Sequence, residues 1–369
     1  MDIIQRNLFR LLRSGTFGDN SKIEPMSEWK WNCLYGISVA HGVSALVYDG
    51  IWKRKNEFFI NFSDCLRSKW EKHVSDIEQH NIHATATVAA LVDEMNKEQF
   101  RPILLKGIPF ASIYDNPLHR QSSDTDIYFP YMPQAKKAAV WAKNKGMNID
   151  ESTKHSLKYI YDGILIDHKK YMQRLTNPML NRKLQQIINS EIRCCDSAYV
   201  RLNGVKTEVP PPTLNLLLML VRTARYILSN GASLKQIADL GMFLRKVGDK
   251  VDYVKLDKWI SSLSLGQMAS LEGHLLIELL MFTEDEIPFI HHKKDNSIDN
   301  MLDNILLMRG TQSVDWHFSQ GKNIFISNSN SGAMMWHIRH SGKLFRFYPS
   351  ETMTNFFSSF ANSLSHIEE

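Results

Sequence analysis

The chain has 369 residues, of which 43% are hydrophobic, 22% charged and 10% aromatic, a composition typical of a globular protein with a sizeable core. Its 44 Lys and Arg against 39 Asp and Glu give a formal net charge of +5, which permits a polyanionic partner without requiring one. These values exclude a disordered, collagen-like or low-complexity chain, and no apolar run approaches the ~18 residues of a membrane span.

The N-terminal segment predicts a protein that stays in the cytoplasm. Arg6, Arg10 and Arg13 recur at helical spacing among apolar residues, without the apolar centre and small-residue cleavage site of a signal peptide. The 4 cysteines show no CxxC spacing, which favours a reducing compartment over a disulfide framework.

Residues 1–98 predict a helical region. The stretch 29–48 is rich in Ala, Val and Leu, and Val88, Leu91, Val92 and Met95 follow the i, i+3, i+4, i+7 spacing of one helix face. The pattern changes at Pro102, where three apolar residues at 103–105 predict a buried strand that leads into a Lys106-Gly107 turn.

The segment 99–209 predicts a small α/β core. A helix is expected at 108–114, a strand at 124–129 that Pro130 ends, and an amphipathic helix at 134–145. Two β-prone runs, 156–161 and 164–168, flank Asp162-Gly163, a dipeptide that tolerates the positive φ of a tight hairpin turn.

Three consecutive prolines at 210–212 predict a domain boundary, because they fix three φ angles and remove three hydrogen-bond donors. Helices are expected at 214–228, 234–247, 254–263 and 268–282, forming a bundle over 210–285. The remaining 286–369 form an extension, with a loop-like stretch at 322–332 and an amphipathic helix at 353–364. The expected fold class is α+β, a small mixed sheet flanked by helical modules.

The residues that carry chemistry are three aspartates. On a strand, Asp124 and Asp126 point to the same face, and Asp167 lies on the second strand of the predicted hairpin. Carboxylates that close repel unless a cation is present, and Mg²⁺ uses one or two protein carboxylates together with substrate phosphates.

Basic residues accompany the aspartates. Lys106 and Gly107 stand where a strand gives way to a helix, a place that favours a phosphate group. Arg120 adds a forked donor suited to phosphate oxygens, although it reads equally well as an ion-pair partner. Arg222, Arg225 and Tyr226 lie one turn apart and face either the active cleft or solvent.

This order of strand, glycine turn, helix, Asp-x-Asp strand and a later strand with one aspartate resembles the nucleotidyltransferase superfamily, whose core is similar to that of DNA polymerase β. More narrowly, the chain resembles an uncharacterised bacterial branch of that superfamily. The resemblance covers roughly residues 30–282, including AHGVSALVY at 40–48 and LKQIADLGMFL at 234–244.

The resemblance implies a transfer of a nucleoside monophosphate from an NTP, with ATP as the expected nucleotide, to an acceptor hydroxyl. It implies that Asp124 and Asp126 bind Mg²⁺ and that Asp167 supports the metal or the attacking hydroxyl. Lys106, Gly107 and Arg120 would bind the triphosphate. The acceptor stays open between a protein side chain, a sugar, a metabolite and an RNA end.

The sequence departs from the superfamily in its turn, where Ile108 stands in place of the usual Ser or Gly. Asp124 also follows Gly107 by seventeen positions, a longer spacing than is common. In the helix after the prolines, Arg222 and Tyr226 stand where relatives tend to carry two histidines. Two alternatives therefore stay open: a toxin-type nucleotidyltransferase acting on RNA, and a degenerate fold that binds a nucleotide or partner without turnover.

Overall fold

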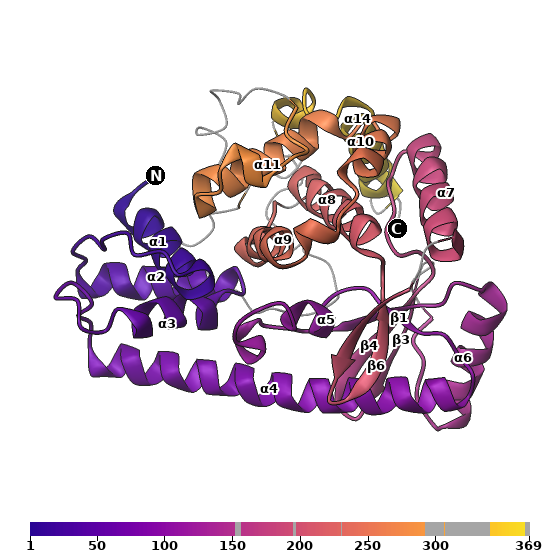
Figure 1. Ribbon diagram of the computed structural model, residues 1–369, viewed down its shortest axis with the longest axis horizontal. Coiled ribbons are helices and arrows are strands. Elements are labelled where there is room, and N and C mark those ends of the chain that lie inside the picture. The colour runs from indigo at the N-terminus through magenta and orange to yellow at the C-terminus, as the bar shows by residue number, and fades with distance from the viewer. Residues whose placement is uncertain (152–155, 195–196, 230, 292–305, 307–339, 366–369) are drawn as a thin grey trace.

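The structure is a computed structural model that describes residues 1–151, 156–194, 197–229, 231–291, 306 and 340–365 (Figure 1). The loop predicted at 322–332 lies outside these residues. Within them, none of the helices is both long and apolar enough to cross a membrane.

The N-terminal region is helical, as predicted. It contains α1 (Ile3–Phe17), α2 (Glu28–Ala40), α3 (Ser44–Lys53) and the long α4 (Asp64–Lys97). The stretch 29–48 forms α2 and the start of α3, separated by a turn in which Gly42 has a φ of 67°. In Figure 1, α4 runs beneath both the other N-terminal helices and the sheet.

A six-stranded mixed sheet forms the centre of the predicted core, in the order β3-β4-β2-β1-β6-β5. Its strands are β1 (Ile103–Leu104), β2 (Thr125–Tyr128), β3 (Ser156–Tyr161), β4 (Ile164–Lys169), β5 (Ala198–Leu202) and β6 (Val205–Val209). β2 pairs with β4 in parallel and with β1 in antiparallel, and β1 pairs with β6 in parallel. The predicted hairpin is confirmed as β3 and β4, with Asp162 and Gly163 at positive φ in its turn.

The two faces of the sheet belong to different hydrophobic cores, because side chains alternate along a strand. Leu104 and Ile127 pack in a cluster with the C-terminal half of α4 and with α6 (Met132–Asn144). Their neighbours Ile103 and Tyr128 join the larger cluster, to which α8 (Pro212–Ser229) contributes. The even positions of β2 therefore face the helices above the sheet in Figure 1.

The helices after the sheet agree with the sequence to within a few residues at most ends. They are α8, α9 (Leu234–Val247), α10 (Tyr253–Ser262), α11 (Gly266–Leu280) and α14 (Pro349–Ser365). A further helix, α7 (Pro178–Cys194), lies between β4 and β5 and was not predicted. α8 includes Pro212, since a proline in the first turn removes no intrahelical hydrogen bond. Shorter elements are α5 (Ile108–Ala111), η1 (Pro117–His119), η2 (Gly248–Lys250) and η3 (Glu284–Glu286). The α+β fold class is confirmed.

Candidate active site

Asp126 and Asp167 lie side by side on neighbouring strands. In the parallel β2–β4 ladder the Cα of Asp126 is the register partner of the Cα of Asp167, so both side chains point to the same face. Both are buried, with 4% and 2% of their surfaces exposed. His168, the next residue on β4, points the other way and lies 2.8 Å from the Tyr159 hydroxyl through its Nε2, as expected for a packing residue.

Two lysines bind the aspartates. Lys106 Nζ lies 3.0 Å from Asp126 Oδ2 and 3.3 Å from Asp124 Oδ2, which confirms that the Asp-x-Asp pair shares one face. Lys169 Nζ lies 2.6 Å from Asp167 Oδ2 and 3.5 Å from Asp126 Oδ1. The lysines thus link all three carboxylates into one charged cluster.

Burial and the neighbouring charges both shift the pKa values of the groups in this cluster. Burial opposes the charge on Lys106, but Asp126 and Asp124 outweigh burial and raise its pKa. Burial likewise raises the pKa of Asp126, while Lys106 opposes that rise. The pKa of Asp124 is lowered, because Lys106 and the Ser123 hydroxyl outweigh its burial.

The turn before α5 is fixed by its glycine. Gly107 has a φ of 81°, and a Cβ at this position would lie 2.9 Å from the carbonyl oxygen of Asp124. The turn and the start of β2 therefore touch backbone to backbone. Ile108, which stands where the resemblance predicted Ser or Gly, is buried in the same smaller core as Leu104. Lys106 supplies the polar group that this turn offers to the cavity.

Arg120 lies in the wall behind the turn. Its Nη2 is 2.6 Å from Asp239 Oδ2 and its Nε 3.1 Å from Asp239 Oδ1, and both side chains are less than a tenth exposed. Its Nη1 also donates to the carbonyl of Gly107, at 3.2 Å. Two roles were predicted for Arg120, and the structure shows the ion pair. A direct contact of Arg120 with phosphate stays a prediction, which the ion pair with Asp239 does not favour.

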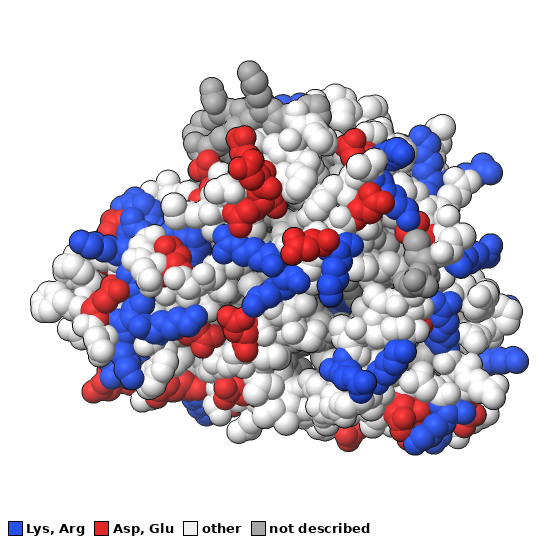
Figure 2. Space-filling view, viewed as in Figure 1, with Lys and Arg blue, Asp and Glu red and all other residues white. Residues whose placement is uncertain are grey.

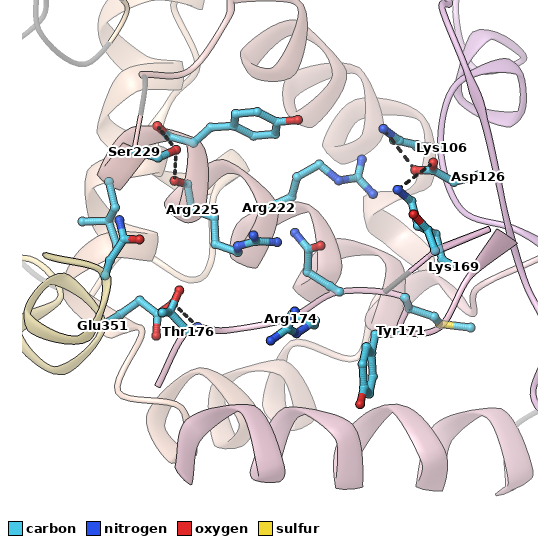
Figure 3. Close-up of a pocket in the computed structure, with 16 residues that line it drawn as sticks. Lys106, Asp126, Lys169, Tyr171, Arg174, Thr176, Arg222, Arg225, Ser229 and Glu351 are labelled. Carbon is cyan, nitrogen blue, oxygen red and sulfur yellow. Dashed lines mark hydrogen bonds and ion pairs between the residues drawn. The ribbon is translucent and has the colours of Figure 1, made fainter. Parts of the chain in front are cut away.

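Asp126, the aspartate at the centre of this cluster, lines a cavity of about 370 Å³ between the sheet, α8 and α14. Figure 3 shows Lys106, Asp126 and Lys169 at one end and Thr176 and Glu351 at the other. Basic side chains predominate in the lining, which includes Lys106, Lys169, Arg174, Arg222 and Arg225 against Asp126 and Glu351. The cavity is therefore suited to an anion.

Two of these cations are not paired. Arg222 and Arg225 extend from α8 into the cavity, and neither guanidinium makes a hydrogen bond or ion pair with the residues that the structure describes (Figure 3). Burial lowers the pKa of both groups below its usual range, and the charges of Asp126 near Arg222 and Glu351 near Arg225 offset this only in part. Of the two predicted orientations, Arg222, Arg225 and Tyr226 adopt the one that faces the cleft.

The carboxylates fit a divalent cation as an open site. Oδ1 of Asp126 and Oδ1 of Asp167 are buried and accept no hydrogen bond, and such oxygens are the ligands that Mg²⁺ prefers. No group of three or more His, Cys, Asp and Glu is arranged to hold a metal ion within the described ranges. The protein thus offers carboxylates at one side of the cavity, the arrangement expected when substrate phosphates complete the ligand set.

Sequence reasoning did not select Lys169, Arg174 or Glu351 as site residues. Lys169 carries a readable signal, because it follows Asp167 by two positions on a strand and so shares its face. Arg174 and Glu351 carry none, since only the tertiary fold brings the 171–176 segment and the C-terminal helix to α8.

Comparisons with known proteins identify a family for most of the chain. Residues 27–280, more than half of the chain, match the family described as "Uncharacterised nucleotidyltransferase". A comparison with curated proteins finds no match. Among solved structures, the chain is similar to an antigenic nucleotidyltransferase-like protein from Paracoccidioides brasiliensis, with 11% identity and a TM-score of 0.38 over 58% of this chain and 95% of that one.

Proposed function

Because the chain belongs to this family of uncharacterised nucleotidyltransferases, we propose that it transfers a nucleoside monophosphate from an NTP to an acceptor hydroxyl and releases pyrophosphate. The observation that carries the proposal is the meeting, in one cavity, of the buried Asp126 carboxylate with the unpaired guanidinium group of Arg222. Carboxylates bind a metal and arginines bind phosphate oxygens, and phosphoryl transfer needs both in one place.

Asp124 and Asp126 would hold Mg²⁺, which neutralises charge on the phosphates when bound. Asp126 Oδ1 is buried and accepts no hydrogen bond, and Lys169 at 3.5 Å is its ion-pair partner, so it has a lone pair available to a metal ion. Lys106 and Arg222 approach Asp126 from the glycine turn and from α8, and they would bind the leaving pyrophosphate.

Asp167 would accept the proton of the acceptor hydroxyl. Its Oδ1 is buried and accepts no hydrogen bond, while Lys169 at 2.6 Å from Oδ2 holds the carboxylate in place. The acceptor oxygen forms a bond to the α-phosphorus, the bond from that phosphorus to the bridging oxygen breaks, and pyrophosphate leaves with the electron pair.

The RNA-directed alternative receives little support from the visible surface. A basic surface beside the cleft is expected of a protein that follows an RNA backbone. On the face shown in Figure 2, Lys and Arg are interspersed with Asp and Glu over most of the molecule. The cavity, not this face, concentrates positive charge.

The proposal is tested by titrating the protein with each NTP in Mg²⁺ and in EDTA, and by incubating it with labelled NTPs and cell extract to find a labelled product. We expect Mg²⁺ to strengthen binding and to be required for labelling, because it links carboxylate to phosphate. Asp126→Asn should remove both effects.

Asp162→Asn is the matched control, since it makes the same change at the exposed hairpin turn of the same sheet. It should behave as the wild type. Equal NTP affinity with and without Mg²⁺, together with no labelled product, would favour the degenerate binder instead.

A further inference from the structure

The cavity extends well beyond the aspartates. Past Arg222, its far end is formed by Arg174 and Thr176 before α7, Arg225 on α8 and Glu351 on α14 (Figure 3). We call this part the arginine end. None of its residues was selected from the sequence as a site residue.

At the arginine end, the carboxylate of Glu351 is hydrogen-bonded to backbone N–H groups and not, among the described residues, to the arginines. Both carboxylate oxygens of Glu351 accept backbone N–H groups at the start of α7, from Thr176 and from Asn177 at 2.8 Å. Glu351 is also only 1% exposed, so its carboxylate interacts mainly with the N-terminus of α7. No ion pair joins it to Arg174 or Arg225 in the part of the chain that the structure describes.

Two cationic side chains are therefore left to a ligand. The guanidinium of Arg174 lies 5.6 Å from the centre of the Tyr171 ring, which orients the group without cancelling its charge. The guanidinium of Arg225 forms no hydrogen bond or ion pair with the described residues, although the nearby charge of Glu351 partly offsets the effect of burial on its pKa. Two guanidinium groups facing one space match the charge of one phosphate group and the forked geometry of its oxygens.

The geometry of the reaction separates this end from the triphosphate. The attacking and leaving oxygens lie on opposite sides of the phosphorus in an in-line transfer. With pyrophosphate at Lys106 and the glycine turn, the acceptor enters from the remaining arm of the cavity, which is the arginine end.

We propose that the arginine end is an acceptor subsite that binds a phosphate group on the acceptor molecule. This rests on the proposed function and names its second substrate class as a small phosphorylated hydroxy compound. The volume of about 370 Å³ suits a small molecule, and α14 closes this end with Glu351 and Asn355. Arg174 and Arg225 lie within the matched residues 27–280, and α14, which closes this end, lies outside them.

The test measures phosphate binding directly on the full chain by titration calorimetry. The probes are inorganic phosphate, glycerol phosphate and a short 5′-phosphorylated RNA, each with and without Mg²⁺ and a saturating non-hydrolysable NTP analogue. We expect glycerol phosphate to bind alongside the analogue, and Arg225→Gln and Arg174→Gln each to weaken it about tenfold. NTP affinity should change less than about twofold.

Arg182→Gln, on the exposed surface of α7 outside the cavity, is the matched control and should change neither affinity. Unchanged glycerol phosphate binding in both cavity variants, or a parallel loss of NTP affinity, overturns the subsite. Tight binding of RNA without binding of glycerol phosphate overturns it in favour of a nucleic-acid acceptor. If the analogue fails to bind while phosphate binding still depends on Arg225, the subsite stands and the proposed transfer fails.

Discussion

Arg120 and Arg222 lie on opposite sides of the same aspartate cluster and differ in one respect. Arg120 is bound by Asp239 at 2.6 Å and by the carbonyl of Gly107, whereas Arg222 faces the cavity without a carboxylate partner. A buried cation with a partner stabilises the fold around it, and one without a partner costs stability and is available to a ligand. We call the paired residues around Arg120, with Asp239 and the Gly107 turn, the frame of the site. We call the unpaired side chains that line the cavity, such as Arg222, its binding surface.

The largest expected effect is on the frame. Asp239→Asn leaves the guanidinium of Arg120 buried and uncompensated, and should lower the free energy of unfolding by about 3 to 5 kcal/mol in urea denaturation. The control is Asp115→Asn, which removes the partner of Lys246 in an exposed pair and should cost less than about 1 kcal/mol. Similar losses from both variants would refute the distinction.

The glycine turn should respond next most strongly. Gly107→Ala forces an L-residue to a φ of 81° and places its Cβ against the carbonyl of Asp124, so we expect a loss of about 1 to 3 kcal/mol and weaker NTP binding. Gly146→Ala isolates the backbone effect, because Gly146 has a φ of 80° with no atom within 4 Å of its Cβ position. If both variants lose NTP affinity equally, contact with Asp124 is not what matters.

The binding surface should show the opposite pattern. Arg222→Gln removes an unpaired cation, so we expect NTP affinity to fall about ten- to a hundredfold while the free energy of unfolding stays the same or rises. Calorimetry and urea denaturation on one preparation measure both quantities. A variant that unfolds more easily but binds NTP normally would place Arg222 in the frame.

The smallest effect tests how the frame is anchored. His119, one residue before Arg120, lies 2.8 Å from Asp49 through Nδ1 and 2.8 Å from Glu78 through Nε2. Burial opposes its charge, but the hydrogen bonds and charges of both acids outweigh burial and raise the pKa of His119 above 6.5. This stabilisation is therefore complete below pH 6.5 and is lost as the pH rises through the raised value.

His119→Gln should accordingly destabilise the protein most near pH ~6, and the difference from the wild type should shrink toward pH ~9. Urea denaturation of both proteins across this range measures it. A difference that does not vary with pH would mean that the imidazole is not charged in the folded protein.

Local patterns predicted most elements of the fold. The Asp162-Gly163 turn fixed the β3–β4 hairpin, and apolar spacing located α6, α8 and α9 within a few residues. The parallel pairing of β1 with β6 was not predictable, because Ile103 and Glu208 are register partners across more than a hundred residues. Such pairing depends on tertiary packing, which leaves no local signal.

The same limit explains the site. Alternation along one strand predicted that Asp124 and Asp126 share a face, whereas the parallel pairing of β2 with β4 is what brings Asp167 to Asp126. The sequence could not decide whether Arg120 is paired, since its partner Asp239 lies on α9, far along the chain. The sequence shows which side chains are charged, but only the fold shows which of them form ion pairs.

The length of α4 has a consequence for any attempt to divide the protein. Its 34 residues span about 50 Å, with Leu66 and Trp70 in the larger core and Val88 and Leu91 in the core beneath the sheet. A fragment beginning at residue 99 would lose one side of the sheet's own core and expose Leu104 and Ile127 to water. The smallest fragment expected to remain folded therefore includes α4, and the sheet is expected to unfold together with the helix that precedes it.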